Sequence, residues 1–264
     1  MTVSLIVATY NQPRSLNLLL LSLETQTKAP DEIIIADDGS NDEVKKIIHS
    51  FSKKSNLNIE HSWQEDRGFR AAKSRNKAIA KSTSKYIIMV DGDMILHPRF
   101  IQDHVDNATP GCYIQGSRVL LTAERTKKIL ENQKILISFF SNGLNNRKNS
   151  IHSVMLSKVF NLLTRKTKKM HSVRSCNMGF YRKDCIKVNG FNNDFEGWGR
   201  EDSEFIARLF NNGLKRKNIR FNLIQYHLWH NESSRESLEK NTLMLKNAII
   251  NQSIWCENGI NRYL

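Results

Sequence analysis

Lys85 to Asp93 reads KYIIMVDGD, an apolar run of strand length that ends in two aspartates separated by one glycine. Two similar runs precede it, Val3 to Ala8 (VSLIVA) and Glu32 to Ala36 (EIIIA), and the second is followed by Asp37-Asp38-Gly39-Ser40. Continuous apolar runs of this length, bounded by turn residues, are typical of strands buried on both faces. The sequence therefore predicts a buried sheet whose strands end in acidic turns.

Helical patterns separate these runs. Ser15 to Thr25 is leucine-rich, Asn41 to Phe51 follows an Asn/Asp cap signal, and Arg70 to Lys81 reads as a third helix after the strand expected over Ile59 to Gln64. Alternating strands and helices favour parallel strands with helical crossovers, which is an α/β fold. Ligands bind beyond the carboxyl ends of such strands, so we expect the acidic turns after residues 36 and 90 to line one cleft.

The second half of the chain is less regular. We expect strands over Cys176 to Tyr181 and Phe221 to His227, a helix over Glu201 to Asn211, and a closing helix over Ser233 to Ile254. The 264 residues, 39% of them hydrophobic, suit one large α/β domain.

The charge is strongly basic, with 40 Lys and Arg against 26 Asp and Glu, a formal net charge of +14. Much of the surplus lies in Arg118 to Lys169, where 12 basic residues accompany only Glu124 and Glu131. Such a surplus attracts diphosphates, nucleic acid or anionic lipid, and the sign of the charge alone does not choose among them.

Cysteine spacing and hydropathy narrow the class of protein. Four cysteines lack CxxC spacing, which argues against a zinc site and suits a reducing cytoplasm: Cys112, Cys176, Cys185 and Cys256. We find no run of about 18 apolar residues and no signal peptide, so we expect a soluble, unprocessed protein.

The Asp91-Gly92-Asp93 turn places two carboxylates where they can share a divalent cation with phosphate oxygens. Acidic turns after strands are also common without a metal. Asp93 is our first choice for direct contact, and an imidazole from the later His227-Leu228-Trp229-His230 segment could complete an octahedral site that favours manganese. We prefer His230 as the second ligand, with His227 as the alternative.

The loop Phe195 to Glu204 combines glycines, a tryptophan and adjacent carboxylates. The Trp198 ring can stack on the apolar face of a sugar, and Asp202 at the start of a helix can accept the proton of an attacking hydroxyl. In the alternative interpretation, Glu201 and Asp202 only favour the helix N-terminus through its dipole.

Six motifs, in this order, resemble those of family 2 glycosyltransferases of the GT-A fold with a galactosyltransferase-like C-terminal part: Ala8-Thr9-Tyr10-Asn11, Asp37 to Ser40, Arg67 to Ala72 with Arg75-Asn76, Asp91 to Asp93, Gly197 to Asp202, and Tyr226 to His230. The resemblance implies a Rossmann-like nucleotide-diphospho-sugar transferase fold, a mixed, mostly parallel sheet flanked by helices. It implies one catalytic domain over 1–264, in which 1–105 binds the nucleotide sugar and 106–230 the acceptor. A basic helical insert spans about 118–170, and 231–264 is a helical tail.

The resemblance also implies the chemistry. An inverting enzyme would move a hexose or N-acetylhexosamine from a UDP-sugar to a glycan or lipid-linked glycan of a bacterial surface polysaccharide. Asp202 would be the general base, with Glu201 beside it as a second catalytic residue. Mn²⁺ or Mg²⁺ at Asp93 and His230 would stabilise the leaving phosphate, and Trp198 and Gly199 would contact the acceptor or sugar. The nucleotide sugar would contact the following residues: Ala8, Tyr10, Asn11, Asp38, Arg70, Asn76, Asp91, Gly92 and Asp93.

Ser153 to Lys169 places apolar residues beside a basic tail. This pattern would suit an interfacial helix on an anionic membrane, and it would equally suit an ordinary amphipathic helix packed on the core. The corresponding location is the cytoplasm, with peripheral contact at the inner face of the cytoplasmic membrane.

Two other classes of protein would share some of these features. A sugar nucleotidyltransferase would need a glycine-rich first loop, whereas Ala8 to Arg14 contains no glycine. A non-catalytic polyanion-binding protein would explain the charge, but zinc-finger spacing and RNA-binding aromatic motifs are missing from the sequence, so we expect no nucleic-acid partner.

Overall fold

The computed structural model describes residues 1–164, 166–231 and 234–264. Its main sheet has seven strands in the following order: β10 (Lys215–Asn218), β6 (Cys112–Gln115), β9 (Met178–Tyr181), β4 (Tyr86–Asp91), β1 (Val3–Thr9), β2 (Glu32–Asp37) and β3 (Ile59–Trp63). β9 is antiparallel to both of its neighbours and the other pairs are parallel, so the predicted mixed, mostly parallel sheet is confirmed.

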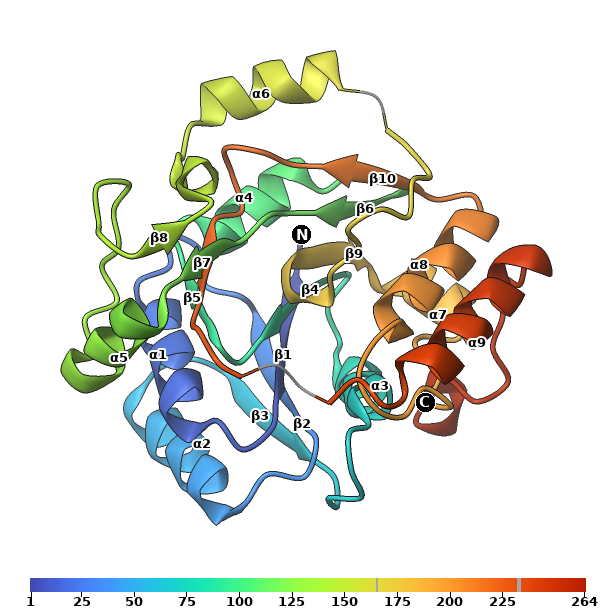
Figure 1. The fold of residues 1–264 in the computed structure, drawn as a ribbon, viewed down its shortest axis with the longest axis horizontal. Coiled ribbons are helices and arrows are strands. Elements are labelled where there is room, and N and C mark those ends of the chain that lie inside the picture. The colour runs from blue at the N-terminus through green and yellow to red at the C-terminus, as the bar shows by residue number, and fades with distance from the viewer. Residues whose placement is uncertain (165, 232–233) are drawn as a thin grey trace.

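Helices flank this sheet on both faces (Figure 1). The helices of the described chain are α1 (Pro13–Glu24), α2 (Asp42–Lys54), α3 (Ala71–Lys81), α4 (Phe100–Asn107), α5 (Ala123–Asn132), α6 (Val154–Leu163), α7 (Arg182–Lys187), α8 (Glu201–Asn211) and α9 (Leu238–Ile250), with short 3₁₀ turns at Arg147–Ser150, Ser175–Asn177 and Ile260–Arg262. None of the helices in these ranges is long and apolar enough to cross a membrane.

The first strand shows why the sheet is buried on both sides. Leu5 and Val7 pack with leucines of α1 and apolar residues of α2, whereas Ile6 packs on the opposite face with α3 and α8. All three side chains are fully buried. Because successive strand residues face opposite sides, a continuous apolar run requires a layer of helices on each side.

A second, four-stranded sheet lies beside the first in the order β5 (Met94–Leu96), β11 (Gln225–His227), β7 (Val119–Leu121) and β8 (Leu144–Asn145). The sequence did not predict this sheet, and two of its strands come from the basic central segment that we expected to be a helical insert. This sheet matters for the site because its β5–β11 pair places the chain just after Asp93 beside the chain near residue 227.

Three elements expected in the second half of the chain are shorter in the structure. The strand expected over Cys176 to Tyr181 begins at Met178, after a 3₁₀ turn. The strand expected from Phe221 begins only at Gln225, because Phe221 and Leu223 have φ of 65° and 56°, in the left-handed region. The helix expected over residues 233–254 spans only Leu238–Ile250, and Ser233 itself lies outside the described residues.

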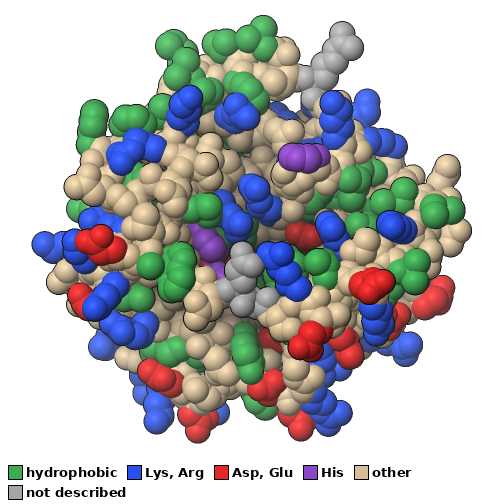
Figure 2. All heavy atoms as spheres, viewed as in Figure 1, with side chains coloured by type: hydrophobic (Ala, Val, Ile, Leu, Met, Phe, Trp, Pro, Cys, Tyr) green, Lys and Arg blue, Asp and Glu red, His purple; other side chains and the backbone are tan. Residues whose placement is uncertain are grey.

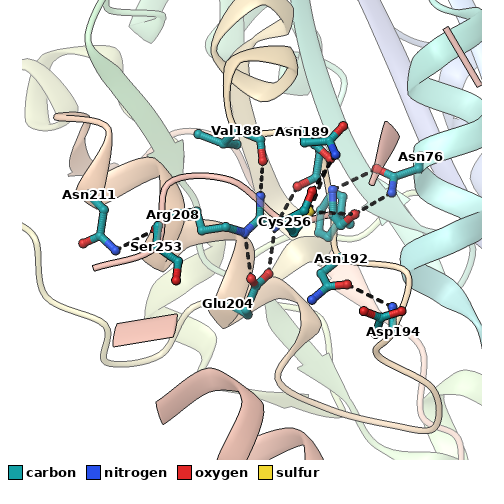
Figure 3. Close-up of polar contacts among 12 residues, drawn as sticks. Asn76, Val188, Asn189, Asn192, Asp194, Glu204, Arg208, Asn211, Ser253 and Cys256 are labelled. Carbon is teal, nitrogen blue, oxygen red and sulfur yellow. Dashed lines mark hydrogen bonds and ion pairs between the residues drawn. The ribbon is translucent and has the colours of Figure 1, made fainter. Parts of the chain in front are cut away.

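A buried ion pair fixes α8. Arg208 is fully buried, and its Nε and Nη2 atoms lie 2.7 and 2.8 Å from the two carboxylate oxygens of Glu204. Its guanidinium also donates to the carbonyls of Val188 and Gly190 (Figure 3). This network holds the helix that begins at Glu201 against the loop after α7.

Replacement of Arg208 by methionine is expected to lower the free energy of unfolding by about 3–5 kcal/mol, because Glu204 would remain buried and charged without a partner. Urea unfolding measures the change, and the additional substitution Glu204→Leu should recover part of it. Arg67→Met is the matched control, since its pair with Glu65 is exposed, and it should cost less than about 1 kcal/mol. Equal losses in the two single variants would contradict this account.

Candidate active site

The acidic turns meet at one edge of the main sheet. The strand register pairs Thr9 with Asp37 and Ala8 with Asp91, so β1 ends between both turns. The Asp38 N–H donates to the Thr9 carbonyl at 3.0 Å, and the Gly92 N–H donates to the Ala8 carbonyl at 2.7 Å. The two acidic strand ends therefore converge, as the sequence predicted.

The second sheet brings two histidines to this edge. Met94 pairs with His227 across β5 and β11, and the Leu228 N–H donates to the Asp93 carbonyl at 3.0 Å. Oδ2 of Asp93 consequently lies 3.3 Å from Nε2 of His227 and 3.1 Å from Nε2 of His230. Figure 2 shows this face of the molecule hollowed near its centre, with histidine side chains in the hollow.

Asp93 and His230 shift each other's pKa values towards their charged forms. Burial alone would raise the pKa of Asp93, but hydrogen bonds from His227 and His230 outweigh it and hold the pKa below its usual range. The hydrogen bond to Asp93 in turn raises the pKa of His230 to about 9. Asp93 is therefore ionised near neutral pH, while His230 carries a proton that a cation would have to displace.

These residues fit a divalent cation. One potential ligand atom from each of Asp93, His227 and His230 lies within 4.8 Å of the others, and Oδ1 of Asp93 is buried without a hydrogen-bond partner among the described residues. Imidazoles with a carboxylate form a donor set for a divalent first-row metal ion, and the carboxylate oxygen is a ligand type that suits Mn²⁺. The structure places both histidines within hydrogen-bond distance of Asp93, so both alternatives left open by the sequence are available as ligands.

A second His/Asp group lies elsewhere. Nε2 of His152 lies 2.9 Å from Oδ2 of Asp103, and the His97 ring stacks on the His152 ring with centroids 4.6 Å apart. The same Asp103 oxygen accepts the Leu223 N–H at 3.2 Å. Asp103 therefore already has two partners, and this group joins α4 to the segments before α6 and β11.

Arg75 connects the two ends of the site. Its buried guanidinium lies 2.8 Å from Oε1 of Glu201, 3.0 Å from Oγ of Ser175 and 3.5 Å from Oδ1 of Asp91. Arg75 stands in one of the sequence motifs but was not predicted to be a site residue. An arginine on the same helical face as Ala72 and Ile79 is the signal that could have identified a buried ion pair.

Asp202 lies in the first turn of α8, where its Oδ1 accepts the Ser203 N–H at 2.6 Å and the Ser203 hydroxyl at 3.1 Å. Burial and the neighbouring Glu201 raise the pKa of Asp202 to about 7, against the opposing effect of Arg75. A carboxyl group with this pKa is suited to exchange a proton near neutral pH.

The loop before α8 requires unusual backbone. Gly197, Gly199 and Arg200 have φ of 75°, 104° and 76°, which explains the glycines in this motif. Asn241 of α9 donates to the Gly199 carbonyl at 2.9 Å and so holds the loop. Trp198 is 40% exposed, and the Arg235 guanidinium carbon lies 5.6 Å from the centroid of its ring.

The turn after β2 presents Asp38. Its Oδ1 accepts from Gln64 and its Oδ2 from the Arg70 N–H, each at 2.6 Å, while burial raises the pKa of its carboxyl. Tyr10 is 45% exposed and donates to Asp66 at 2.8 Å. Asn11, with φ of 48°, accepts from the Asn41 N–H at 2.9 Å.

The Arg70 backbone N–H contacts Asp38, whereas its guanidinium donates to the Glu65 carbonyl in the loop after β3. Asn76, by contrast, is not brought to this group. It is fully buried, donates to the Phe191 carbonyl and to Asn193, and accepts from the Phe191 N–H, at 2.6, 2.9 and 2.8 Å. Both amide hydrogens are used, so its role in the structure is to tie α3 to the loop after α7 (Figure 3).

The fold and this acidic edge define a GT-A glycosyltransferase. The family model described as glycosyl transferase family 2 matches residues 4–184, and the chain belongs to that family. A second model, described as the N-terminal domain of galactosyltransferase, matches residues 158–231, the range that contains Asp202 and both histidines.

Similar proteins include hyaluronan synthase of Pasteurella multocida, which is 30% identical over 91% of this chain and 26% of that protein. Chondroitin synthase of Escherichia coli is 27% identical over 80% of this chain and 32% of that protein. The chain thus spans about a third or less of the length of these two relatives.

Among solved structures, TarS residues 1–349 of S. aureus in complex with UDP has a TM-score of 0.64 at 18% identity, covering 95% of this chain and 66% of that one. The mannosyltransferase PcManGT of Pyrobaculum calidifontis, in complex with GDP-Man and Mn²⁺, has a TM-score of 0.64 at 16% identity, covering 94% and 64%. These similarities confirm the fold.

Proposed function

We propose that this glycosyltransferase moves a hexose or N-acetylhexosamine from a UDP-sugar to a hydroxyl of a glycan or lipid-linked glycan in bacterial surface polysaccharide synthesis. Relatives that synthesise hyaluronan and chondroitin support a glycan acceptor, and the TarS complexes with UDP and UDP-GlcNAc support the donor class. We assign donor binding to residues 1–105, acceptor binding to 106–230 with the basic segment 118–170, and a supporting role to the tail, 231–264.

The observation that carries this proposal is a contrast between two carboxyl groups. The pKa of Asp93 is held below its usual range by two imidazoles, whereas burial and Glu201 raise the pKa of Asp202 to about 7. Environments that separate the pKa values of two carboxyl groups mark one as a permanent charge and the other as a proton carrier. Glycosyl transfer to a hydroxyl can use both, the charged group to hold a cation beside the leaving phosphate and the proton carrier to act as base.

At the donor end, Asp38 accepts the imide N–H of uracil and the exposed Tyr10 ring lies against the base, with Ala8 and Asn11 lining the turn. Gln64 and the Arg70 N–H support this role by holding the Asp38 carboxylate in place. The cationic Arg70 offsets diphosphate charge.

Asp91, Gly92 and Asp93 face the diphosphate of the donor, and Asp93, His227 and His230 would hold Mn²⁺ or Mg²⁺. When bound, the cation supplies positive charge beside the leaving phosphate. The positive charge of Arg75 also lies near this end of the site, because its guanidinium is 3.5 Å from Oδ1 of Asp91.

In the transfer step, the acceptor oxygen forms a bond to the anomeric carbon while the bond from that carbon to the β-phosphate oxygen breaks. UDP leaves with the electron pair, and Asp202 accepts the hydroxyl proton through its carboxylate. Attack opposite the leaving group inverts the anomeric configuration. Trp198 stacks on the sugar or acceptor beside Gly199, and Glu201, held by Arg75, is the positioning residue that keeps Asp202 basic.

The proposed setting is the cytoplasm, at the inner face of the cytoplasmic membrane. The four cysteines support a reducing compartment, because all of them are buried and none forms a disulfide.

Incubation with a panel of UDP-sugars and soluble oligosaccharide acceptors, with Mn²⁺ or EDTA, tests this function. We expect one UDP-sugar to release UDP only with the metal and to give a product of inverted anomeric configuration, seen by NMR of the new linkage. GDP-mannose is the control donor. Consumption of GDP-mannose alone would contradict the UDP-sugar donor. Retention of configuration would contradict the inverting mechanism, and full activity in EDTA would contradict the metal requirement.

A further inference from the structure

The helix α6 presents its apolar face to solvent. Met155, Leu162 and Leu163 are 71%, 85% and 80% exposed, and Val159 is 47% exposed. These four positions follow the helical spacing i, i+4, i+7 and i+8, so they form one continuous face. An ordinary amphipathic helix would pack this face on the core.

The opposite face of α6 attaches it to the body. Ser157 is buried, the Phe160 ring contacts the Phe221 ring edge-on with centroids 6.4 Å apart, and Asn161 donates to Asn107 at 3.1 Å. Figure 1 shows α6 at the upper edge of the molecule, beyond β10. The helix is therefore held in place from one side while its apolar side remains uncovered.

The surroundings of this face are basic. The segment 145–170, which contains α6, has seven Lys and Arg residues and no Asp or Glu. Lys158 lies within α6, and Lys166 and Lys169 follow it, all three exposed. Figure 2 shows hydrophobic side chains gathered along this upper edge with Lys and Arg side chains below them.

We propose that α6 is an interfacial helix that inserts its apolar face, formed by Met155, Val159, Leu162 and Leu163, into a bilayer containing anionic phospholipids. An apolar stripe bordered by lysines matches a surface of acyl chains beneath negative headgroups. The ten residues of α6 extend about 15 Å, half the thickness of a bilayer core, so the helix lies in the interface. A second copy of the chain is a poorer occupant, because a symmetric contact would place one basic surface against another.

This proposal is independent of the sugar donor, and it is tested without one. The intact protein is sedimented with vesicles of phosphatidylcholine alone or mixed with phosphatidylglycerol. We expect binding to the mixed vesicles that weakens with salt, and little binding to phosphatidylcholine. Leu162→Ser with Leu163→Ser should weaken it about tenfold or more for each leucine, and Lys158→Gln with Lys166→Gln about fivefold for each lysine.

The matched control is Leu243→Ser with Ile250→Ser on α9, where the side chains are 60% and 76% exposed, and it should leave vesicle binding unchanged. Circular dichroism melting curves verify that each variant is folded. Absence of binding to the mixed vesicles, equal binding to both vesicle types, or equal loss in the α9 control would overturn the proposal. So would a dimer in light scattering that the α6 variants dissociate, since a second copy would then cover the face.

Discussion

Replacement of Asp202 by asparagine is expected to lower the rate of sugar transfer by about a thousandfold while UDP still binds. Asparagine keeps the shape of the side chain and its contact with Ser203, but it cannot accept the proton of the acceptor hydroxyl, and proton transfer of this kind contributes about 10²–10⁴ in rate. Steady-state kinetics and calorimetric titration with UDP separate the two effects.

The pH dependence gives an independent measure of the same residue. Because burial and Glu201 raise the pKa of Asp202 to about 7, the carboxylate form that acts as base should decline as the pH falls through 7. kcat/KM should then fall about tenfold for each further pH unit. Glu196→Gln, an exposed carboxylate in the same loop, is the control and should keep both rate and profile. Substantial activity of Asp202→Asn with an unchanged profile would exclude Asp202 as the base.

Replacement of Asp93 by asparagine is the second change with a large expected effect. It removes the ionised group that faces His227 and His230, and we expect the loss of Mn²⁺ binding together with a decrease in rate of about a hundred- to a thousandfold. Electron paramagnetic resonance of Mn²⁺ measures binding directly. The pKa of His230, followed by NMR, should fall from about 9 towards its ordinary value, because its hydrogen bond to Asp93 is the largest cause of the shift.

The second His/Asp group supplies the control for Asp93. His152→Gln alters a histidine that contacts a buried aspartate at 2.9 Å, yet it lies outside the site and should leave Mn²⁺ affinity unchanged. Equal loss of affinity in both variants, or full affinity in Asp93→Asn, would show that the cation binds elsewhere.

The first hundred residues could be predicted from sequence almost element by element, because apolar runs and caps are local signals. Asn41 caps α2 as expected, and its side chain accepts from the Glu43 N–H at 3.1 Å. The second sheet could not be predicted, because strands of two or three residues such as β8 and β5 leave no periodic pattern.

In the candidate site, too, the local motifs could be predicted from the sequence and the non-local contacts could not. Asp38, Asp93 and Asp202 stand in recognisable motifs, but the contacts that tune them are non-local: Arg75 meets Glu201 across 126 residues of sequence. Asn76 was expected near the nucleotide because it is a polar residue within a motif. Its burial depends on packing between distant segments, which the sequence does not reveal. For α6 the sequence showed apolar and basic residues, but the direction in which the apolar face points required the structure.

The contact of Asp93 with His227 and His230 also has a consequence for synthesis of the chain, because the three residues leave the ribosome at different times. The aspartate is synthesised early and the histidines more than a hundred residues later, an interval on the order of ten seconds at ordinary elongation rates. During this time β1 to β4 can already assemble, but the nascent chain has no complete set of ligands for a cation. We therefore expect any cation held by these three residues to bind late in the biogenesis of the protein, after the main sheet has begun to form.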